Sequence, residues 1–211
     1  RTDEMLTGSK EFAHAEARLR ELQAAEVRAQ LAADVADDEV AGHFAGLPPR
    51  YFRVQTVREI VADLKLAHVF LLRQMADDDD DAFEPVLDWQ HESDRGFSEV
   101  KVCTWDRPGL FAKLTGALTA AGLNIHSAEI FTRADDIVLD TFWVTDALTG
   151  TLANAEEQAR FRRLLNEAVT GLANLADLIQ RRTTAKPLYQ AHEGERIPTH
   201  IRFDHTASEG R

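Results

Sequence analysis

The stretch that decides the fold is VCTWDRPGLF at residues 102–111, which is followed by GLNI at residues 122–125. Alternating apolar residues predict a strand over Phe97–Trp105. Apolar residues at helical spacing then predict a helix over Pro108–Ala121, because Pro108 suits the first turn and Gly122 suits the end. The central element is therefore a strand that turns sharply into an amphipathic helix.

The residues after this element continue the order to β-α-β-β-α. Two strands, Asn124–Arg133 and Ile137–Thr145, are separated by a short polar turn and should pair as a hairpin. A second amphipathic helix is predicted over Ala155–Thr170. The order predicts an antiparallel sheet with two helices on one face, in a domain at residues 97–172.

The fourth strand of that sheet has two candidate sources, Pro85–His91 before the domain and Thr199–His205 after it. The two regions resemble each other: shifted by 114 residues, Leu87 meets Ile201, Trp89 meets Phe203, His91 meets His205 and Gly96 meets Gly210. This repeat predicts that residues 173–211 are a linker and the lead-in to a second, truncated unit. The sequence leaves both sources of the fourth strand open.

The first 75 residues are predicted to be all-helical, which makes the chain α+β. Apolar spacings indicate helices over Ser9–Ala33 and Asp38–Gly46, and the Pro48–Phe52 segment is expected to turn the chain. Thr56 and Glu59 have the spacing of a capping box at the start of a third helix.

Residues 76–96 are predicted to be an acidic linker and a lead-in strand. Nine acidic residues and no Lys or Arg occur between Ala76 and Asp94, including the run Asp77–Asp81. Self-repulsion favours a solvated linker. A calcium site is the sharper alternative, but the run lacks the interleaved glycine and the distal glutamate of a calcium loop.

Composition excludes several classes of function. The net charge of −12 and pI of about 5.1 disfavour nucleic acid and anionic membrane surfaces as partners. No apolar run approaches the roughly 20 residues that span a bilayer, and no signal pattern is evident at the start. The single cysteine, Cys103, excludes an internal disulfide and is expected to be a packed strand thiol. A cytoplasmic location is the expectation.

The turn at residues 106–110 has the chemistry to bind a free amino acid. The helix start there leaves N–H groups unpaired with a partial positive charge, which suits a carboxylate, and Gly109 lets a ligand approach the backbone. Asp106 can accept an α-ammonium group, and Asn124 can add a donor and an acceptor. In the alternative interpretation the three residues have structural roles alone: Asp106 caps the helix, Gly109 lets the helix pack against the strand, and Asn124 accommodates the bend after Gly122.

The D-x-P-G-L-F and G-L-N-I elements together resemble an ACT domain, a small ferredoxin-like module. ACT domains bind amino acids at the interface of paired copies, so the resemblance implies ACT–ACT pairing, possibly in a homodimer. It also implies a ligand site on these matched positions: Asp106, Arg107, Pro108, Gly109, Leu110, Asn124 and Ile125.

A narrower resemblance covers about residues 35–211. The LPPRYF segment at residues 47–52 and the PTHIRFDHTAS segment at residues 198–208, together with the ACT-like unit, are similar to the C-terminal part of the bifunctional PII uridylyltransferase/uridylyl-removing enzyme family. In that family a nucleotidyltransferase domain and an HD hydrolase domain precede two glutamine-sensing ACT domains. The resemblance implies that residues 1–34 join the hydrolase domain to the sensor, and that the PII signalling protein is the partner of the whole enzyme.

No catalytic motif is expected in this chain. Gly8-Ser9 is not followed by paired aspartates, and no His-Asp dipeptide occurs, so no catalytic residue, metal ligand or cofactor is predicted here. The resemblance places the divalent metal in catalytic domains outside this segment. Two departures from the family are the acidic run and the missing second unit.

Two alternative functions remain: a ligand-free ACT-type dimerisation module, and the ACT sensor of another amino-acid metabolic enzyme.

Overall fold

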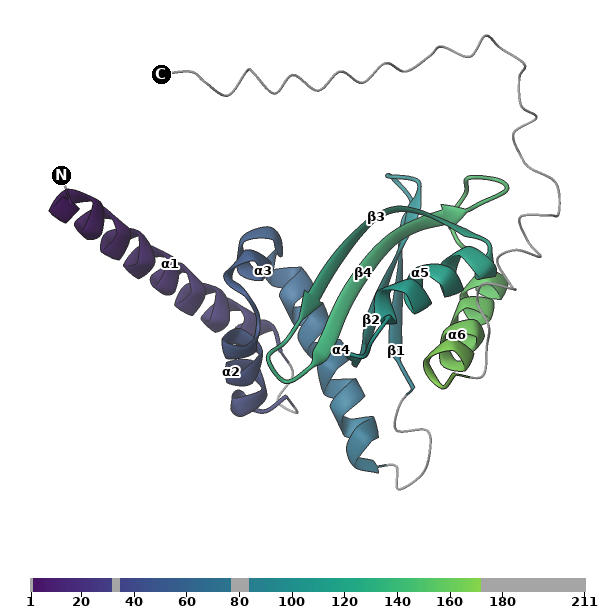
Figure 1. Cartoon of the computed structure of the whole chain (residues 1–211), viewed down its shortest axis with the longest axis horizontal. Helices are drawn as coiled ribbons and strands as arrows, with labels where there is room; N and C mark the ends of the chain where they lie inside the picture. The colour runs from purple at the N-terminus through teal and green to yellow at the C-terminus, as the bar shows by residue number, and fades with distance from the viewer. Residues whose placement is uncertain (1, 32–34, 77–83, 172–211) are drawn as a thin grey trace, which may run out of the picture.

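The computed structural model describes residues 2–31, 35–76 and 84–171. Within these ranges a helical segment is followed by a sheet with two further helices (Figure 1). The predicted α+β class is confirmed. The acidic run Asp77–Asp81 and the predicted linker and second lead-in at residues 173–211 lie outside the described residues.

The sheet has four antiparallel strands in the spatial order β1-β2-β4-β3. Their bounds are β1 Val86–Glu92, β2 Phe97–Trp105, β3 Leu123–Thr132 and β4 Ile137–Asp146. The strand β2 has the predicted bounds, and β3 and β4 form the predicted hairpin within one residue of each predicted end. The hairpin turn closes where the Arg133 amide donates to the Ile137 carbonyl at 2.8 Å.

The fourth strand comes from the segment before the domain. The strand β1 pairs with β2 along its whole length, from Val86 opposite Cys103 to Glu92 opposite Phe97. The sequence left this choice open, and the structure settles it for the described residues. The strand that lies beside β2 at this edge of the sheet therefore precedes β2 in the sequence.

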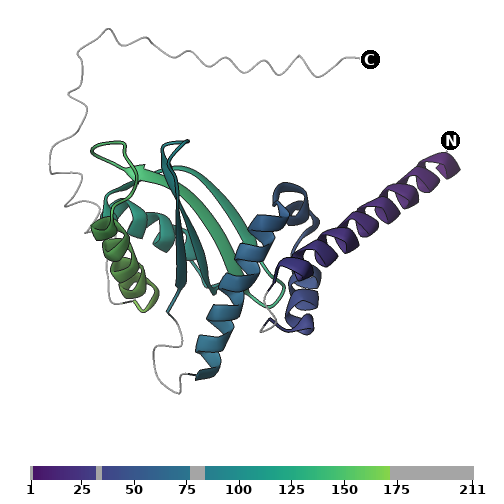
Figure 2. The ribbon, with the colours of Figure 1, turned by 180° about the vertical axis from the view of Figure 1, so that it is seen from behind.

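Two helices, α5 (Leu110–Ala121) and α6 (Ala155–Val169), cover one face of the sheet, as predicted (Figure 2). The helix α5 begins two residues after the predicted start, because Gly109 is its N-cap and takes a left-handed φ of 74°. Asn154 and Glu157 form a capping box at the start of α6. The core between helices and sheet is apolar and includes Leu114, Leu118, Phe161, Leu165, Val100, Val102, Phe142 and Val144.

The helical segment consists of α1 (Thr2–Gln30), α2 (Asp37–Gly46), α3 (Pro49–Val54) and α4 (Val57–Ala76). The expectation that Pro48–Phe52 only turns the chain is wrong, because Pro49 occupies a first-turn position of α3, where its missing N–H costs nothing. The predicted capping box of α4 is confirmed: the Thr56 amide donates to Glu59 at 2.6 Å, and the Glu59 amide donates to the Thr56 hydroxyl at 3.3 Å.

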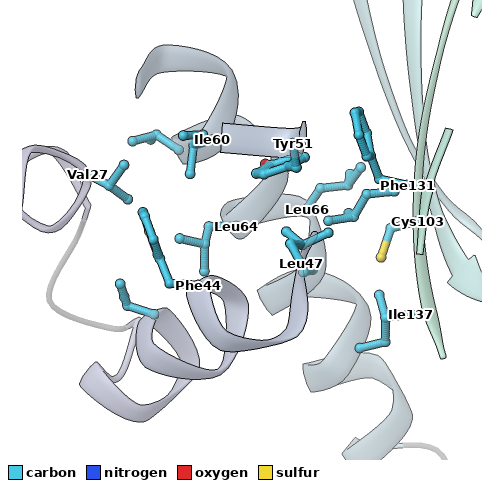
Figure 3. Packing of buried hydrophobic residues seen from close by; sticks show 14 of the residues in the cluster. Val27, Phe44, Leu47, Tyr51, Ile60, Leu64, Leu66, Cys103, Phe131 and Ile137 are labelled. Atoms are coloured by element: carbon cyan, nitrogen blue, oxygen red, sulfur yellow. The ribbon is translucent and has the colours of Figure 1, made fainter. Parts of the chain in front are cut away.

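This helical segment covers part of the second face of the sheet, which the sequence did not predict. Figures 1 and 2 show α4 on the opposite side of the sheet from α5 and α6, with the first half of α1 projecting away from the body. In the core between these helices and the sheet, Tyr51 and Phe131 stack edge to face with their ring centroids 5.0 Å apart (Figure 3). Cys103 is fully buried there, as expected of a packed thiol, and burial raises its pKa.

None of the described helices is both long enough and apolar enough to cross a membrane.

Candidate functional site

The turn between β2 and α5 is open at its surface and lacks a side-chain cap. Gly109 is exposed, and a Cβ added there would meet no other atom within 4 Å. Gly109, the N-cap of α5, has no side chain that could cap the first turn, and a capping role for Asp106 stays a prediction. The Asp106 backbone anchors the turn, because its amide donates to the Asp136 carbonyl at 2.7 Å. The helix start is left available to an anion.

The five predicted residues of this turn take different positions. Asp106, Pro108 and Gly109 are exposed, whereas Leu110 is buried in the core beneath α5. Arg107 is half-buried and donates to the Val169 carbonyl at 3.2 Å, which ties the turn to the end of α6. Burial lowers the pKa of Arg107. Leu110 and Arg107 therefore shape the turn, and the three exposed residues face solvent.

Asn124 and Ile125 lie at the far end of the sheet from this turn. Along β4, Trp105 pairs with Ile137, and Leu123 pairs with Asp146. The length of β4 therefore separates the two predicted groups, which is about 30 Å at about 3.4 Å per residue. Asn124 is exposed, and Ile125 is half-buried against the core. A single copy does not bring the two groups together.

The comparisons with known proteins identify the unit that carries this turn. The ACT domain family matches residues 99–164. These residues form an ACT domain. The match covers β2, α5, the β3–β4 hairpin and most of α6, which are the elements that position the turn.

The chain is also similar to three curated relatives that are each named bifunctional uridylyltransferase/uridylyl-removing enzyme, which confirms the narrower resemblance. The relative from Rhodospirillum rubrum is 30% identical over 207 residues, which cover 97% of this chain and 21% of the relative. The relative from Gluconobacter oxydans is 31% identical over 119 residues, covering 55% of this chain and 12% of the relative. The relative from Azospirillum brasilense is 33% identical over 116 residues, which cover 54% of this chain and 12% of the relative. The chain thus spans about a fifth or less of the relatives' length.

Two further polar residues of the ACT domain lie beneath the turn, and the sequence reasoning missed both. Thr104 is fully buried and Asp140 is 2% exposed. The Thr104 Oγ1 and Asp140 Oδ1 atoms have no hydrogen-bond partner among the described residues. Burial, together with the charge of Asp106, raises the pKa of Asp140 to about 7, although the backbone amide of Phe131 opposes the shift. The alternation of β4 could have indicated Asp140, because Asp140 takes the core-facing position between Val138 and Phe142.

A chain of buried polar groups joins the ACT sheet to the helical segment. The Lys101 ammonium of β2 lies 2.7 Å from the Asp63 carboxylate of α4, and the Tyr51 hydroxyl donates to the same carboxylate at 2.7 Å. The Tyr51 hydroxyl lies 3.2 Å from the His43 ring. Burial, together with the charge of Arg133, lowers the pKa of His43 to about 3, so its ring is neutral. These hydrogen bonds and the ion pair connect the ACT sheet to the helical segment, and the Nδ1 atom of His43 has no partner among the described residues.

A groove of about 480 Å³ lies on the same face of the sheet, beside the first turn of α4. Its lining includes Arg58, Glu59, Glu99, Lys101, His126 and Trp143. Most of these charges already have partners: Lys101 pairs with Asp63, Glu59 caps α4, and Glu99 accepts from the Trp143 indole at 3.0 Å. The groove is therefore a polar surface cleft between the start of α4 and the sheet. Among the described residues, no cluster of three or more potential ligands could hold a metal ion.

Proposed function

We propose that this chain is the amino-acid-sensing regulatory region of a bifunctional uridylyltransferase/uridylyl-removing enzyme, and that its ligand is glutamine. The observation that carries the proposal is the similarity over 97% of the chain to a relative of that name, together with the ACT domain at residues 99–164. The catalytic domains, their divalent metal and the PII protein partner would belong to the rest of the enzyme in the cytoplasm, and the regulated process would be nitrogen metabolism.

The uncapped start of α5 supports a place for the ligand. The carboxylate of glutamine would bind the free N–H groups of the first turn of α5, beside Gly109, and its ammonium group would lie toward Asp106. Because Asn124 and Ile125 lie at the other end of the sheet, they would contact a ligand held by a neighbouring ACT unit. The complete site would therefore form between two paired units.

Regulation would follow from the preference of glutamine for one arrangement of the paired units. A ligand shifts an equilibrium only by the difference in its affinity for the two states. In this proposal the glutamine-bound arrangement favours removal of uridylyl groups over their transfer. At a hundred times its dissociation constant, glutamine would stabilise the folded chain by roughly 2.7 kcal/mol.

Thermal unfolding with and without glutamine tests the proposal. We expect glutamine to raise the melting temperature of the wild type, and this shift to disappear in Asp106→Ala and Gly109→Ala. Gly150→Ala is the matched control, because Gly150 also has a positive φ, of 70°, and open space around it, but lies in the loop before α6. An equal shift with every amino acid, or an equal loss in the Gly150 variant, would contradict a specific site at the turn.

A ligand-free dimerisation module is the second candidate. Its support is the exposed apolar surface of the ACT domain, with Phe111 53% and Ile130 41% exposed, beside β3, which pairs only with β4 among the described strands. This function predicts association that depends on protein concentration and does not change with amino acids. Sedimentation with and without glutamine separates the two candidates.

A further inference from the structure

Two buried oxygen atoms, which have no partner among the described residues, lie near the end of β2 that leads into α5. Buried oxygen atoms are normally hydrogen-bonded, because leaving one unpaired costs about 1–3 kcal/mol. The Thr104 Oγ1 and Asp140 Oδ1 atoms are exceptions within residues 2–31, 35–76 and 84–171, as are His43 Nδ1 and Gln74 Nε2 toward the helical segment. The two oxygen atoms occur in the same small region of the sheet, next to a helix start that also lacks a side-chain cap. An explanation is needed for both groups together.

The register of the sheet places these two side chains beside each other. Thr104 pairs with Val138, and Val102 pairs with Asp140, across β2 and β4. Directly paired residues share a face, and both valines belong to the core beneath α5 and α6. Thr104 and Asp140 are thus diagonal neighbours on that face, with Cβ atoms about 7 Å apart. A small group placed between them could contact both oxygens.

The chemistry of the region favours a cationic hydrogen-bond donor. Burial raises the pKa of Asp140 and the charge of Asp106 adds to the increase, so the two carboxyl groups are close enough to repel. No Lys, Arg or His forms an ion pair with Asp140 among the described residues. An ammonium group supplies three N–H donors, and Asp140, Thr104 and Asp106 supply three acceptors. Two hydrogen bonds of about 2.8 Å from one nitrogen span oxygens about 5 Å apart, which fits diagonal neighbours.

We infer that Asp140 and Thr104, with Asp106, receive the α-ammonium group of the amino acid whose carboxylate binds the start of α5. This inference rests on the proposed function and assigns the residues that distinguish an α-amino acid from its deaminated analogue. Asp140 lies one strand from the sheet edge, opposite the exposed Ile130 of β3. The half-exposed Phe111 side chain of α5 stacks on Phe142, which follows Asp140 by two residues on the same face of β4.

The test compares glutamine with 4-carbamoylbutanoate, which has the same carboxylate and side chain but no ammonium group. Isothermal titration measures both ligands on the wild type, Asp140→Asn and Thr104→Val. We expect the wild type to bind glutamine at least tenfold more tightly than the analogue. Asp140→Asn should lose at least tenfold in glutamine affinity and most of the preference, and Thr104→Val a smaller part, whereas both variants should bind the analogue as the wild type does.

Asp136→Asn is the matched control for the loss of one negative charge at this end of the sheet. Asp136 is exposed in the β3–β4 turn, and its φ of 63° is well tolerated by asparagine. It should bind both ligands as the wild type does.

Each outcome decides one question. If the wild type binds glutamine and Asp140→Asn keeps both affinity and preference, the inference is overturned while the proposed function stands. If the wild type binds no amino acid, the proposed function fails and the inference fails with it. If Asp140→Asn does not fold, as circular dichroism would show, Thr104→Val carries the test: an unchanged preference for glutamine in that variant overturns the inference.

Discussion

The two faces of the sheet handle buried polar groups in different ways. On the face toward the helical segment, Lys101, Asp63, Tyr51 and His43 form a continuous hydrogen-bonded chain, although the Nδ1 atom of His43 has no partner among the described residues. On the face toward α5 and α6, Asp140 lies in an otherwise apolar core and one of its oxygens has no partner among the described residues. The comparison distinguishes a connected polar chain that holds two parts of the molecule together from a buried carboxyl that lies alone in an apolar core.

His43 and Asp140, which lie on opposite faces of the sheet, contribute to stability with opposite dependence on pH. The pKa of His43 is lowered to about 3, so His43 contributes stability above the ordinary histidine pKa, and this is lost as the pH falls through the range from 6.5 to 3. The pKa of Asp140 is raised to about 7, so its contribution is present at low pH and lost as the pH rises from 4 to 7. Acid therefore removes the contribution of His43 and restores that of Asp140, while Asp63 on the helical face, whose pKa is raised by burial, responds in the same direction as Asp140.

The largest effect should come from breaking the paired face. Lys101→Met leaves the Asp63 carboxylate buried without its cation, and should lower the free energy of unfolding by about 3–5 kcal/mol. Urea unfolding at pH 7 measures it. Lys65→Met, an exposed change on α4, is the control and should stay within about 0.5 kcal/mol of the wild type. A loss of similar size in both variants would contradict the distinction between the faces.

The opposite result is expected on the unpaired face. Asp140→Asn removes a carboxyl that must ionise while buried, and a shift of about three pH units corresponds to about 4 kcal/mol at most. The variant should match the wild type near pH 4 and exceed its stability above pH 7. The measurement is the free energy of unfolding at pH 4, 5.5 and 8. If the free energy of unfolding changes with pH in the same way in the variant and in the wild type, the pKa of Asp140 is not raised.

A smaller change sharpens the comparison within the paired face. Tyr51→Phe keeps the ring stacking on Phe131 but removes the hydroxyl that joins Asp63 to His43. The free energy of unfolding should fall by about 1–3 kcal/mol, because two buried polar groups lose a partner. Guanidinium unfolding provides the number. No loss at all would mean that the polar chain contributes nothing beyond the Lys101–Asp63 pair.

The smallest effect concerns the start of α4, which carries Asp63 to the sheet. Thr56→Ala removes the capping hydroxyl and should cost about 1 kcal/mol. Thr119→Ala, in the last turn of α5, is the control and should be close to neutral, because the Thr119 hydroxyl only bonds back to Thr115 within its own helix. Thermal unfolding of both variants checks the difference.

The sequence predicted the elements of the ACT domain well because their patterns are local. The bounds of β2, the β3–β4 hairpin and the two helices follow from apolar spacing and turn residues within each segment. The covering of the second sheet face was missed, because Lys101 and Asp63 are 38 residues apart and neither pattern indicates the other. For the site, the sequence placed the turn at residues 106–110 but gave no sign that Thr104 and Asp140 would lie unpaired beneath it.

The position of β1 ahead of β2 affects how the chain can fold as it is synthesised. The four strands that the structure describes lie between Val86 and Asp146, so all of them have been translated before α6 begins. Two of the three strand pairings, β1–β2 and β3–β4, are hairpins between neighbours in sequence, and only β2–β4 joins distant segments. An edge strand taken from residues 199–205 would instead have left β2 open until much later. The four described strands can therefore pair on the ribosome before α6 has been made.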